Sequence, residues 1–491
     1  MDKNETSYNT IFKSTFLFAV VRVFTILAKL VVNKSAALFL GTAGLGLIGL
    51  LQTTINLVAT FCGLGISKSA IRDISANNIP NNNKLFQIIS VTNGLIFLSS
   101  FLGAMITIVM SSALSRLTFG NEDHAISFLF LSIAVFFIIL NQGKLAILTG
   151  MRKLTYLAKA SILGCIFGIA PAVPLYYYFE KDGIIPALIL VPAISFFFTL
   201  YYEKKMNNKA EKINISLLKN DGIGMLKMGL SLMYVSLWVF FSEYIIKTYI
   251  ASIDSLEVVG IFQAGSTIVM GYFGIITTAM ATEYYPRISA IHNKNHQLKN
   301  EVNKQVKVGL VLLLPLVVFF LLFLPTIVQL LYTKDFLSSI DYIQYAIFGV
   351  IIIACSNPMG MILLAKQNAK IFLFSITLSR IVGLILSIYF FNNYGLKGLG
   401  LAYLAYALFE LFFMQTLLNF LYSIRLDLRT IKILILTLLL CSFAFFVNDI
   451  PDLMYRFCAG ILVFMISISY AFQIITKTMK IDIKSFIQGG E

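Results

Sequence analysis

The chain has 491 residues, of which 58% are hydrophobic and only 12% charged, and its mean hydropathy is +0.85. These values exclude a soluble globular protein and predict an all-α polytopic membrane protein. The formal net charge of +15 comes from 38 Lys and Arg against 23 Asp and Glu, a large excess for a chain with so few charged residues.

Apolar runs along the chain predict about 14 transmembrane helices, because a span of about 20 apolar residues crosses a bilayer core. The predicted spans lie near residues 11–32, 44–66, 86–111, 125–148, 156–178, 184–202, 223–250, 256–282, 306–331, 341–364, 370–391, 397–421, 431–447 and 456–476. The longest polar connections, near 203–222 and 284–305, are shorter than the ~50 residues that an independent domain needs. A separate catalytic domain is therefore not expected.

The first apolar run contains three cations, Lys13, Arg22 and Lys29. A cation near the middle of a span costs roughly 2.5–3.5 kcal/mol on insertion scales. Arg22 and Lys29 are seven residues apart and share one helix face. This face is expected to line a polar cavity that receives an anionic group. Lys13 is near the helix end on the opposite face, where its side chain reaches the interface.

Positive residues are concentrated in alternate loops, and this bias predicts the orientation of the chain in the membrane. The loops after even-numbered spans are basic, for example the loop with Lys144, Arg152 and Lys153. The loops after odd-numbered spans are short and mostly acidic, for example at Glu122 and Asp123. Both termini are therefore expected in the cytoplasm, which an even number of spans allows.

An internal repeat divides the predicted spans into two halves. Gly49-Leu-Leu-Gln52 recurs as Gly260-Ile-Phe-Gln263, and Ile74-Ser-Ala76 recurs as Ile288-Ser-Ala290. Six spans separate the copies, so both have the same orientation, as in parallel repeats related by an axis along the membrane normal. The expected domains are an N-lobe of six helices (1–204), a cytoplasmic linker (205–222), a C-lobe of six helices (223–422), and two further helices with a short tail (423–491).

Three short patterns carry a resemblance to a known family. They are Lys34 followed by Gly41-Thr-Ala-Gly-Leu-Gly46, with Gly65-Ile66 and Arg72 downstream; Gly150-Met-Arg152; and Val259-Gly-Ile-Phe-Gln263. In their order and spacing, the chain resembles the O-antigen and lipid III flippases (Wzx-type). These are polysaccharide transporters of the multidrug/oligosaccharidyl-lipid/polysaccharide (MOP) exporter superfamily.

The resemblance implies a fold and a function. The fold would be a two-lobed, MATE-like helical transporter that works by alternating access. The substrate would be an undecaprenyl-diphosphate-linked oligosaccharide, a repeat unit of O-antigen or a related surface polysaccharide. The chain would move it from the cytoplasmic to the periplasmic leaflet of the bacterial inner membrane. The implied partners are this lipid-linked oligosaccharide, inner-membrane lipids and a polysaccharide polymerase.

A diphosphate crossing hydrocarbon needs fixed cations in a cavity of low dielectric constant. Arg22, Lys29, Lys34 and Lys247 are the candidate cations for this role, and Lys34 and Lys247 are equivalent in the repeat. Each of the last two has an alternative reading. Lys34 lies past the end of its helix and can reach the interface. Lys247 lies one turn from Glu243, which would neutralise it.

Further candidate site residues fall into three groups. Arg380 and Glu410 are predicted to pair in mid-membrane, as a structural pair or as an ion-coupled switch, and Glu243 has the same two readings. Arg72, Arg152 and Arg287 are candidates for a cytoplasmic gate or are charges for anionic headgroups. Gln52 and Gln263 are candidates for binding glycan or for bridging helices.

No pattern for catalysis, a metal or a cofactor is found in the sequence. The five cysteines and three histidines lack the spacing of a disulfide framework or a metal site, and P-loop and nucleophile-elbow motifs are missing. The chain is therefore expected not to be an enzyme and to bind neither ATP nor nucleic acid. The alternative function is a cation-coupled multidrug exporter of the same superfamily, which would need acids in its cavity rather than cations.

Overall fold

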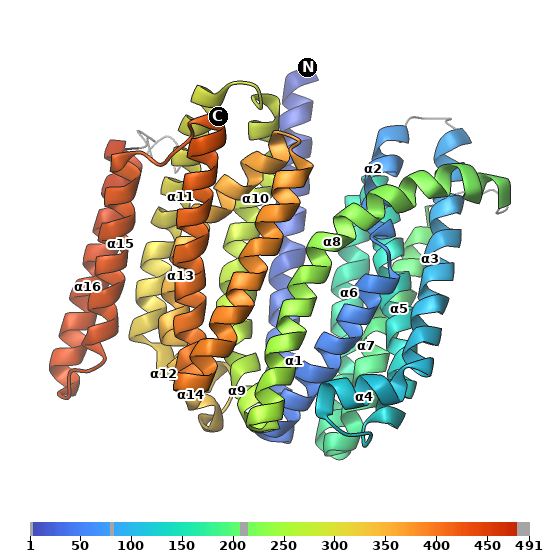
Figure 1. Cartoon of the computed structure of the whole chain (residues 1–491), viewed down its shortest axis with the longest axis horizontal. Helices are drawn as coiled ribbons and strands as arrows, with labels where there is room; N and C mark the ends of the chain where they lie inside the picture. Colours follow the sequence, from blue (N-terminus) through green and yellow to red (C-terminus); the bar gives the residue numbers. More distant parts are fainter. Residues whose placement is uncertain (1–2, 79–82, 207–214, 479–491) are drawn as a thin grey trace. The chain divides into compact units, whose positions relative to one another are not determined.

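The computed structural model describes residues 3–78, 83–206 and 215–478, with side chains of the first helix placed from Phe24 onward. Every regular element in these ranges is helical (Figure 1). The α-helices are α1 (Lys3–Cys62), α2 (Ile66–Asn77), α3 (Asn83–Val109), α4 (Ser111–Phe119), α5 (Ala125–Gly150), α6 (Leu154–Tyr178), α7 (Ile184–Lys204), α8 (Ile215–Ile253), α9 (Leu256–Ser266), α10 (Phe273–Ala290), α11 (Asn295–Leu322), α12 (Leu324–Leu331), α13 (Ile340–Ala365), α14 (Ala369–Tyr422), α15 (Leu428–Val447) and α16 (Leu453–Gln473). Single 3₁₀ turns are η1 (Glu180–Gly183) and η3 (Lys334–Ser339), and π-helical turns are η2 (Thr267–Tyr272) and η4 (Ile474–Thr478).

Within the described ranges, 11 helices are long and apolar enough to cross a membrane, as expected for a polytopic membrane protein. Two of them are broken by a glycine in the left-handed region, α1 at Gly41 (φ 67°) and α14 at Gly395 (φ 57°). Each break falls between two predicted spans. A Cβ at either position would meet no atom within 4 Å, so the backbone angle and not the available space calls for glycine there.

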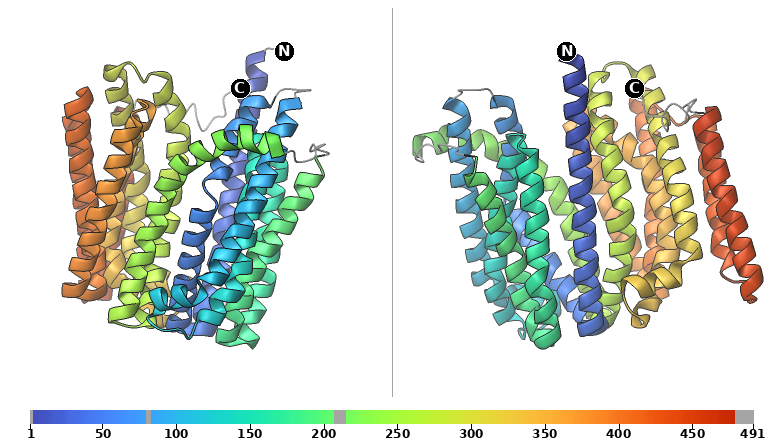
Figure 2. Two further views of the ribbon diagram at one scale, coloured as in Figure 1. Left: turned by 45° about the vertical axis from the view of Figure 1, so that its right-hand side comes forward. Right: turned by 180° about the vertical axis from the view of Figure 1, so that it is seen from behind.

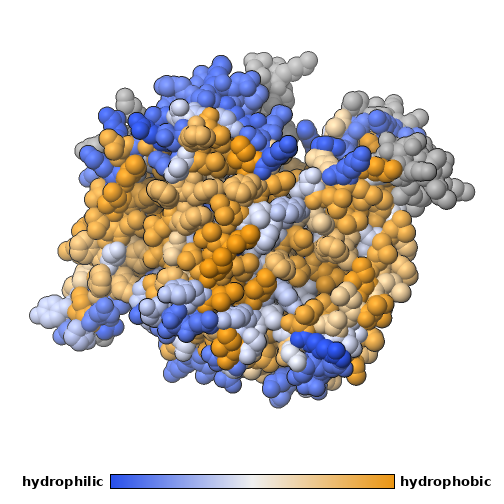
Figure 3. All heavy atoms as spheres, viewed as in Figure 1, coloured by the Kyte–Doolittle hydropathy of each residue, from blue (hydrophilic) through white to orange (hydrophobic). Residues whose placement is uncertain are grey.

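The helix flanks are apolar, and many large side chains on them face outward. Phe412 is 73% exposed and Val109 is 77% exposed, which is tolerable only where hydrocarbon replaces water as the solvent. In the surface view, hydrophobic residues cover the helix flanks and hydrophilic residues gather at the helix ends (Figure 3). This distribution is the one that a bilayer requires.

Contacts divide the chain into two compact units, residues 1–260 and 261–491. In unit 1, α5 packs against α3 and α7, α6 packs against α7 and α1, and α8 packs against α1, α2 and α3. In unit 2, α13 packs against α14 and α11. The helices α15 and α16 form an antiparallel pair against α11 (Figure 2). The division places α8 in unit 1, whereas the repeat assigns it to the predicted C-lobe.

The helix boundaries repeat along the chain. Adding 215 to the bounds of α5 gives the bounds of α13, and α3 with α4 corresponds to α11 with α12 at a closely similar offset. Backbone exceptions repeat as well. The offset between α5 and α13 also relates Arg152 (φ 54°) to Gln367 (φ 56°), and Glu180 (φ 46°) to Gly395. The repeat found in short sequence matches is thus present in the order and length of the helices.

Candidate functional site

Among the described side chains of unit 1, the most deeply buried cation is Lys247 on α8, which is 1% exposed. Its ammonium donates hydrogen bonds to Glu243 Oε1 (2.5 Å), one turn earlier, and to Thr53 Oγ1 of α1 (2.6 Å), and Gly49 O lies 3.5 Å away. Removing an ammonium from water costs several kcal/mol unless it is paired and hydrogen-bonded. The geometry therefore favours the alternative reading of Lys247, in which Glu243 neutralises it.

A chain of hydroxyl groups lies beside this pair. Thr54 Oγ1 is 3.5 Å from Thr118 Oγ1 of α4, which is 3.2 Å from the Tyr244 hydroxyl of α8. Thr54 also donates to Leu50 O. Thr53 and Thr54 of α1 thus connect to Glu243–Lys247 and to Tyr244 of α8, the second through Thr118. The threonine hydroxyls are buried, where leaving one unpaired would cost free energy.

Close backbone packing joins α8 to the start of α2. Gly65, which precedes α2, has a left-handed φ of 63°, and a Cβ built there would lie 2.0 Å from the carbonyl oxygen of Gly229 on α8. A Cβ at Gly229 would lie 2.4 Å from Leu64 O. Only glycine at both positions permits this contact.

A cavity of about 340 Å³, here called the Lys68 pocket, lies between α1, α2, α5 and α8. It is lined by Ala59, Thr60, Gly63, Gly65, Ser67, Lys68, Ile71, Gln142, Leu145, Ala146, Thr149, Met233, Ser236 and Phe240. The Lys68 ammonium donates a hydrogen bond to the Ser236 hydroxyl. The sequence patterns do not single out Lys68 as a site residue.

The predicted cations of α1 occupy different environments. The Arg22 side chain lies outside the described residues. Lys29 is exposed and lies close enough to the Cys165 thiol of α6 to interact with it electrostatically, and Lys34 is half-buried. Their role in substrate binding remains a prediction.

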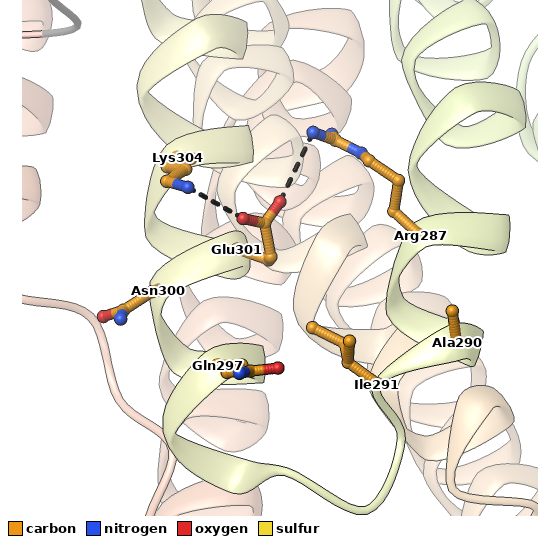
Figure 4. Close-up of a pocket in the computed structure, with 7 residues that line it drawn as sticks. All are labelled: Arg287, Ala290, Ile291, Gln297, Asn300, Glu301 and Lys304. Atoms are coloured by element: carbon orange, nitrogen blue, oxygen red, sulfur yellow. Dashed lines mark hydrogen bonds and ion pairs between the residues drawn. The ribbon is translucent and has the colours of Figure 1, made fainter.

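Arg287 lies in unit 2 and lines an open pocket of about 490 Å³ between α10 and α11 (Figure 4). It contacts Glu301 (3.3 Å) and donates to Gln305 Oε1 (2.9 Å), while Lys304 contacts the other oxygen of Glu301 (2.9 Å). One carboxylate thus holds two cations, and the pocket keeps a net positive charge.

The other two candidate gate residues are in unit 1. Arg72 is exposed on α2 and pairs with the adjacent Asp73 (2.6 Å). Arg152 is exposed after α5, with a left-handed φ of 54°. Both arginines lie where α2 meets the end of α5, since Ser75 donates to Gly150 O and Asn78 to Met151 O (3.1 Å each). A gating role for them remains a prediction.

Arg380 and Glu410 both lie on α14, at equal distances along the chain before and after its break at Gly395. They do not form the predicted ion pair, because no nitrogen–oxygen distance between these two described side chains is within 4.0 Å. The Arg380 guanidinium instead has Tyr403 and Tyr406 as electrostatic neighbours alongside Glu410. One carboxylate oxygen of Glu410 is buried without a hydrogen-bond partner.

The two repeat-equivalent glutamines differ in their surroundings. Gln52 is exposed on α1. Gln263 on α9 donates to Thr267 Oγ1 one turn later (3.2 Å), and its Oε1 is buried without a partner in the described structure. Their sequence equivalence therefore does not extend to their contacts, and binding of glycan by either remains a prediction.

One buried pair was missed in the sequence. Lys144 was assigned to a basic loop, but it lies within α5, where its ammonium contacts Glu203 of α7 (2.8 Å) and donates to Asn93 of α3 (2.8 Å). Glu203 is 7% exposed. The sequence signal for this pair is a single cation close to the end of an apolar run. Cations that determine membrane orientation occupy the same kind of position, so the sequence does not distinguish the two cases.

Comparison with known proteins identifies the family. A family model described as "Polysaccharide biosynthesis protein" matches residues 36–341, more than half of the chain. The chain belongs to this family. It is 22% identical to the lipid III flippases of Escherichia coli (strain K12) and Shigella flexneri over 389 residues, which are 77% of this chain and 91% of those proteins. The predicted resemblance is confirmed, and the family is one of transporters and not of enzymes.

Solved structures support the same fold. The chain is similar to the lipid II flippase MurJ in an inward closed conformation, with a TM-score of 0.72 and 16% identity over 96% of this chain and 100% of that one. It is also similar to an inward-facing multidrug resistance MATE family transporter of the MOP superfamily, with a TM-score of 0.65 and 17% identity over 82% and 96% of the two chains. The MOP/MATE-like fold expected from the sequence is confirmed.

Proposed function

We propose that the protein is a flippase for an undecaprenyl-diphosphate-linked oligosaccharide, the repeat unit of O-antigen or a related surface polysaccharide. It moves this lipid from the cytoplasmic to the periplasmic leaflet of a bacterial inner membrane. The observation that carries the proposal is the match to the polysaccharide biosynthesis family, extended by similarity to lipid III flippases over 77% of the chain.

The proposed topology has 14 spans, with both termini in the cytoplasm and two six-helix lobes related by a pseudo-twofold axis along the membrane normal. The repeat of helix boundaries supports it, because equivalent helices of the two copies are separated by six predicted spans and so share one orientation. Alternating access of the two lobes to the two sides of the membrane would carry the substrate across.

The charge of the transport path fits an anionic substrate. Arg22, Lys29 and Lys34 follow one another along α1 before its break at Gly41, and attraction between a cation and a diphosphate is strong where water is scarce. Glu243, the intramembrane acid of unit 1 that the sequence singled out, is already bound to Lys247. An exporter of organic cations would need such an acid to be available.

The test is the leaflet distribution of the lipid-linked oligosaccharide after depletion of this protein. We expect the intermediate to accumulate on the cytoplasmic face, wild type to restore its export, and the double variant Arg22→Ala with Lys29→Ala to fail. Rescue by the double variant would leave the flippase function in place and remove these two cations from it. An unchanged distribution after depletion would overturn the proposed substrate.

A further inference from the structure

The Lys68 pocket contains a positive charge that no protein carboxylate balances. Lys68 is the only charged residue among those that line it. Lys68 is exposed and makes no ion pair within the described part of the chain, whereas the more enclosed Lys144 and Lys247 of unit 1 contact Glu203 and Glu243. Burial lowers the pKa of Lys68 below its ordinary value, because the ammonium loses part of its hydration. A bound anion would restore that loss.

The rest of the pocket is neutral, and its hydrogen-bonding side chains are set in a mostly apolar wall. Hydroxyl groups come from Thr60, Ser67, Thr149 and Ser236, and an amide comes from Gln142. The Ser236 hydroxyl accepts from Lys68 and keeps its own proton to donate. The aromatic ring of Phe240 and the side chain of Met233 complete the wall. Such a wall suits a sugar, which offers hydroxyl groups at its edge and an apolar face.

The position of the pocket suits the phosphate end of a lipid. Gln142 is eight residues before the end of α5, about 12 Å along the helix axis at 1.5 Å per residue. Lys68 lies just past the last apolar residues of α1, at the start of α2. In the proposed topology this is the cytoplasmic end of both helices, where the phosphates of lipids in that leaflet lie.

We propose that the Lys68 pocket binds the sugar next to the diphosphate, with Lys68 on a phosphate oxygen and the hydroxyl and amide groups on the sugar. This subsite rests on the proposed flippase function. A volume of about 340 Å³ is near the lower limit of small-molecule sites. It accommodates one sugar and its phosphate, so the remaining sugars extend beyond it.

Three short-chain probes in titration calorimetry separate the two halves of the subsite. They are geranyl diphosphate carrying N-acetylglucosamine, geranyl diphosphate alone, and geranyl N-acetylglucosaminide without phosphate. Lys68→Gln should weaken both diphosphate probes by about tenfold, the loss of one charge-assisted hydrogen bond, and leave the phosphate-free probe unchanged. Gln142→Ala should weaken only the two probes that contain the sugar. Lys153→Gln, an exposed cation outside the pocket, is the matched control.

The outcomes distinguish the subsite from the function. If wild type binds the complete probe and Lys68→Gln binds it within twofold of wild type, the subsite is overturned and the flippase function stands. If wild type binds none of the three probes, the substrate itself is overturned, and the subsite with it. Thermal unfolding of each variant establishes that it is folded, and Lys68→Arg, which keeps the charge, should retain most of the affinity if Lys68→Gln does not fold.

Discussion

At the scale of single residues, burial decides how an ion pair responds to loss of either partner. Lys247 is 1% exposed, whereas the Glu243 side chain is 40% exposed. A carboxylate left alone keeps an open side that water in the proposed transport path can reach, but an ammonium left alone at Lys247 stays enclosed by protein. Removing one partner of a buried pair costs several kcal/mol chiefly because the other remains charged and unpaired.

This difference predicts unequal effects of two substitutions. Glu243→Gln should lower the free energy of unfolding by about 3 kcal/mol, because it leaves the Lys247 charge buried. Lys247→Met should cost about 1 kcal/mol, since the exposed Glu243 carboxylate gains water. Differential scanning fluorimetry on Trp238, the single tryptophan, measures both. Equal losses would mean that the two groups are equally solvated.

The double variant Glu243→Gln with Lys247→Met is the control for this pair. It leaves no charge behind, so it should be more stable than Glu243→Gln alone. A double variant as unstable as the worse single variant would place the loss in packing against Thr53 and not in the buried charge.

His124 gives a pH-dependent prediction outside the membrane spans. Its ring lies 4.1 Å from that of Phe119, and burial lowers its pKa below the ordinary value, with Asp123 acting in the opposite direction. Since the unfolded chain then binds a proton at higher pH than the folded chain, stability should fall as pH decreases through about 6.5. His124→Gln should reduce the drop in unfolding temperature between pH 7.5 and 5.5. An unchanged drop would show that His124 does not cause it.

At the scale of elements, glycines set how closely helices approach. The contact of α2 with α8 depends on Gly65 and Gly229, whose backbones touch. Gly224, on the same helix, has no atom within 4 Å of its would-be Cβ. Gly224 and Gly229 thus have the same helix propensity and opposite surroundings.

Alanine at these two positions should therefore have opposite effects. Gly229→Ala should destabilise the protein by about 1–3 kcal/mol, because the backbone at Leu64 and Gly65 must move. Gly224→Ala should stabilise it by up to about 1 kcal/mol through helix propensity alone. Thermal unfolding of the purified variants measures both. Similar values for the two would show that α8 is not held against the start of α2.

At the scale of the whole molecule, the sequence predicts the fold class, the family and most span positions. These predictions succeed because hydropathy and the glycines between spans are local features of the sequence. Gly41 and Gly395 both fall between predicted spans. The short helix α4 (Ser111–Phe119) lies between the predicted spans 86–111 and 125–148, because it is too short to cross a bilayer. Helix α12 is merged with α11 in the predicted span 306–331, although Pro325 stands at its start. The pairing of Lys144 with Glu203 joins two helices that are far apart in the sequence, which local patterns cannot specify.

The orientation of the whole chain is tested by single cysteines in a cysteine-free background. In intact cells from which the outer membrane has been permeabilised, Lys181→Cys and Lys334→Cys should react with a membrane-impermeant maleimide. Lys153→Cys and Lys294→Cys should react only after the inner membrane is opened. All four positions are exposed, so access and not burial decides the labelling. Labelling of all four in intact inner membranes would contradict the proposed topology.

The recurring helix boundaries have an evolutionary consequence. If the two copies arose by duplication of one ancestral segment, each position from α3 to α7 has an equivalent position between α11 and α14. Selection has since acted on both positions within one polypeptide. The left-handed site kept by Gly395 in one copy is occupied by Glu180 in the other. A difference of this kind marks a position at which the two copies have diverged. The effect of a substitution in one copy can therefore be compared with the residue at the equivalent position of the other copy.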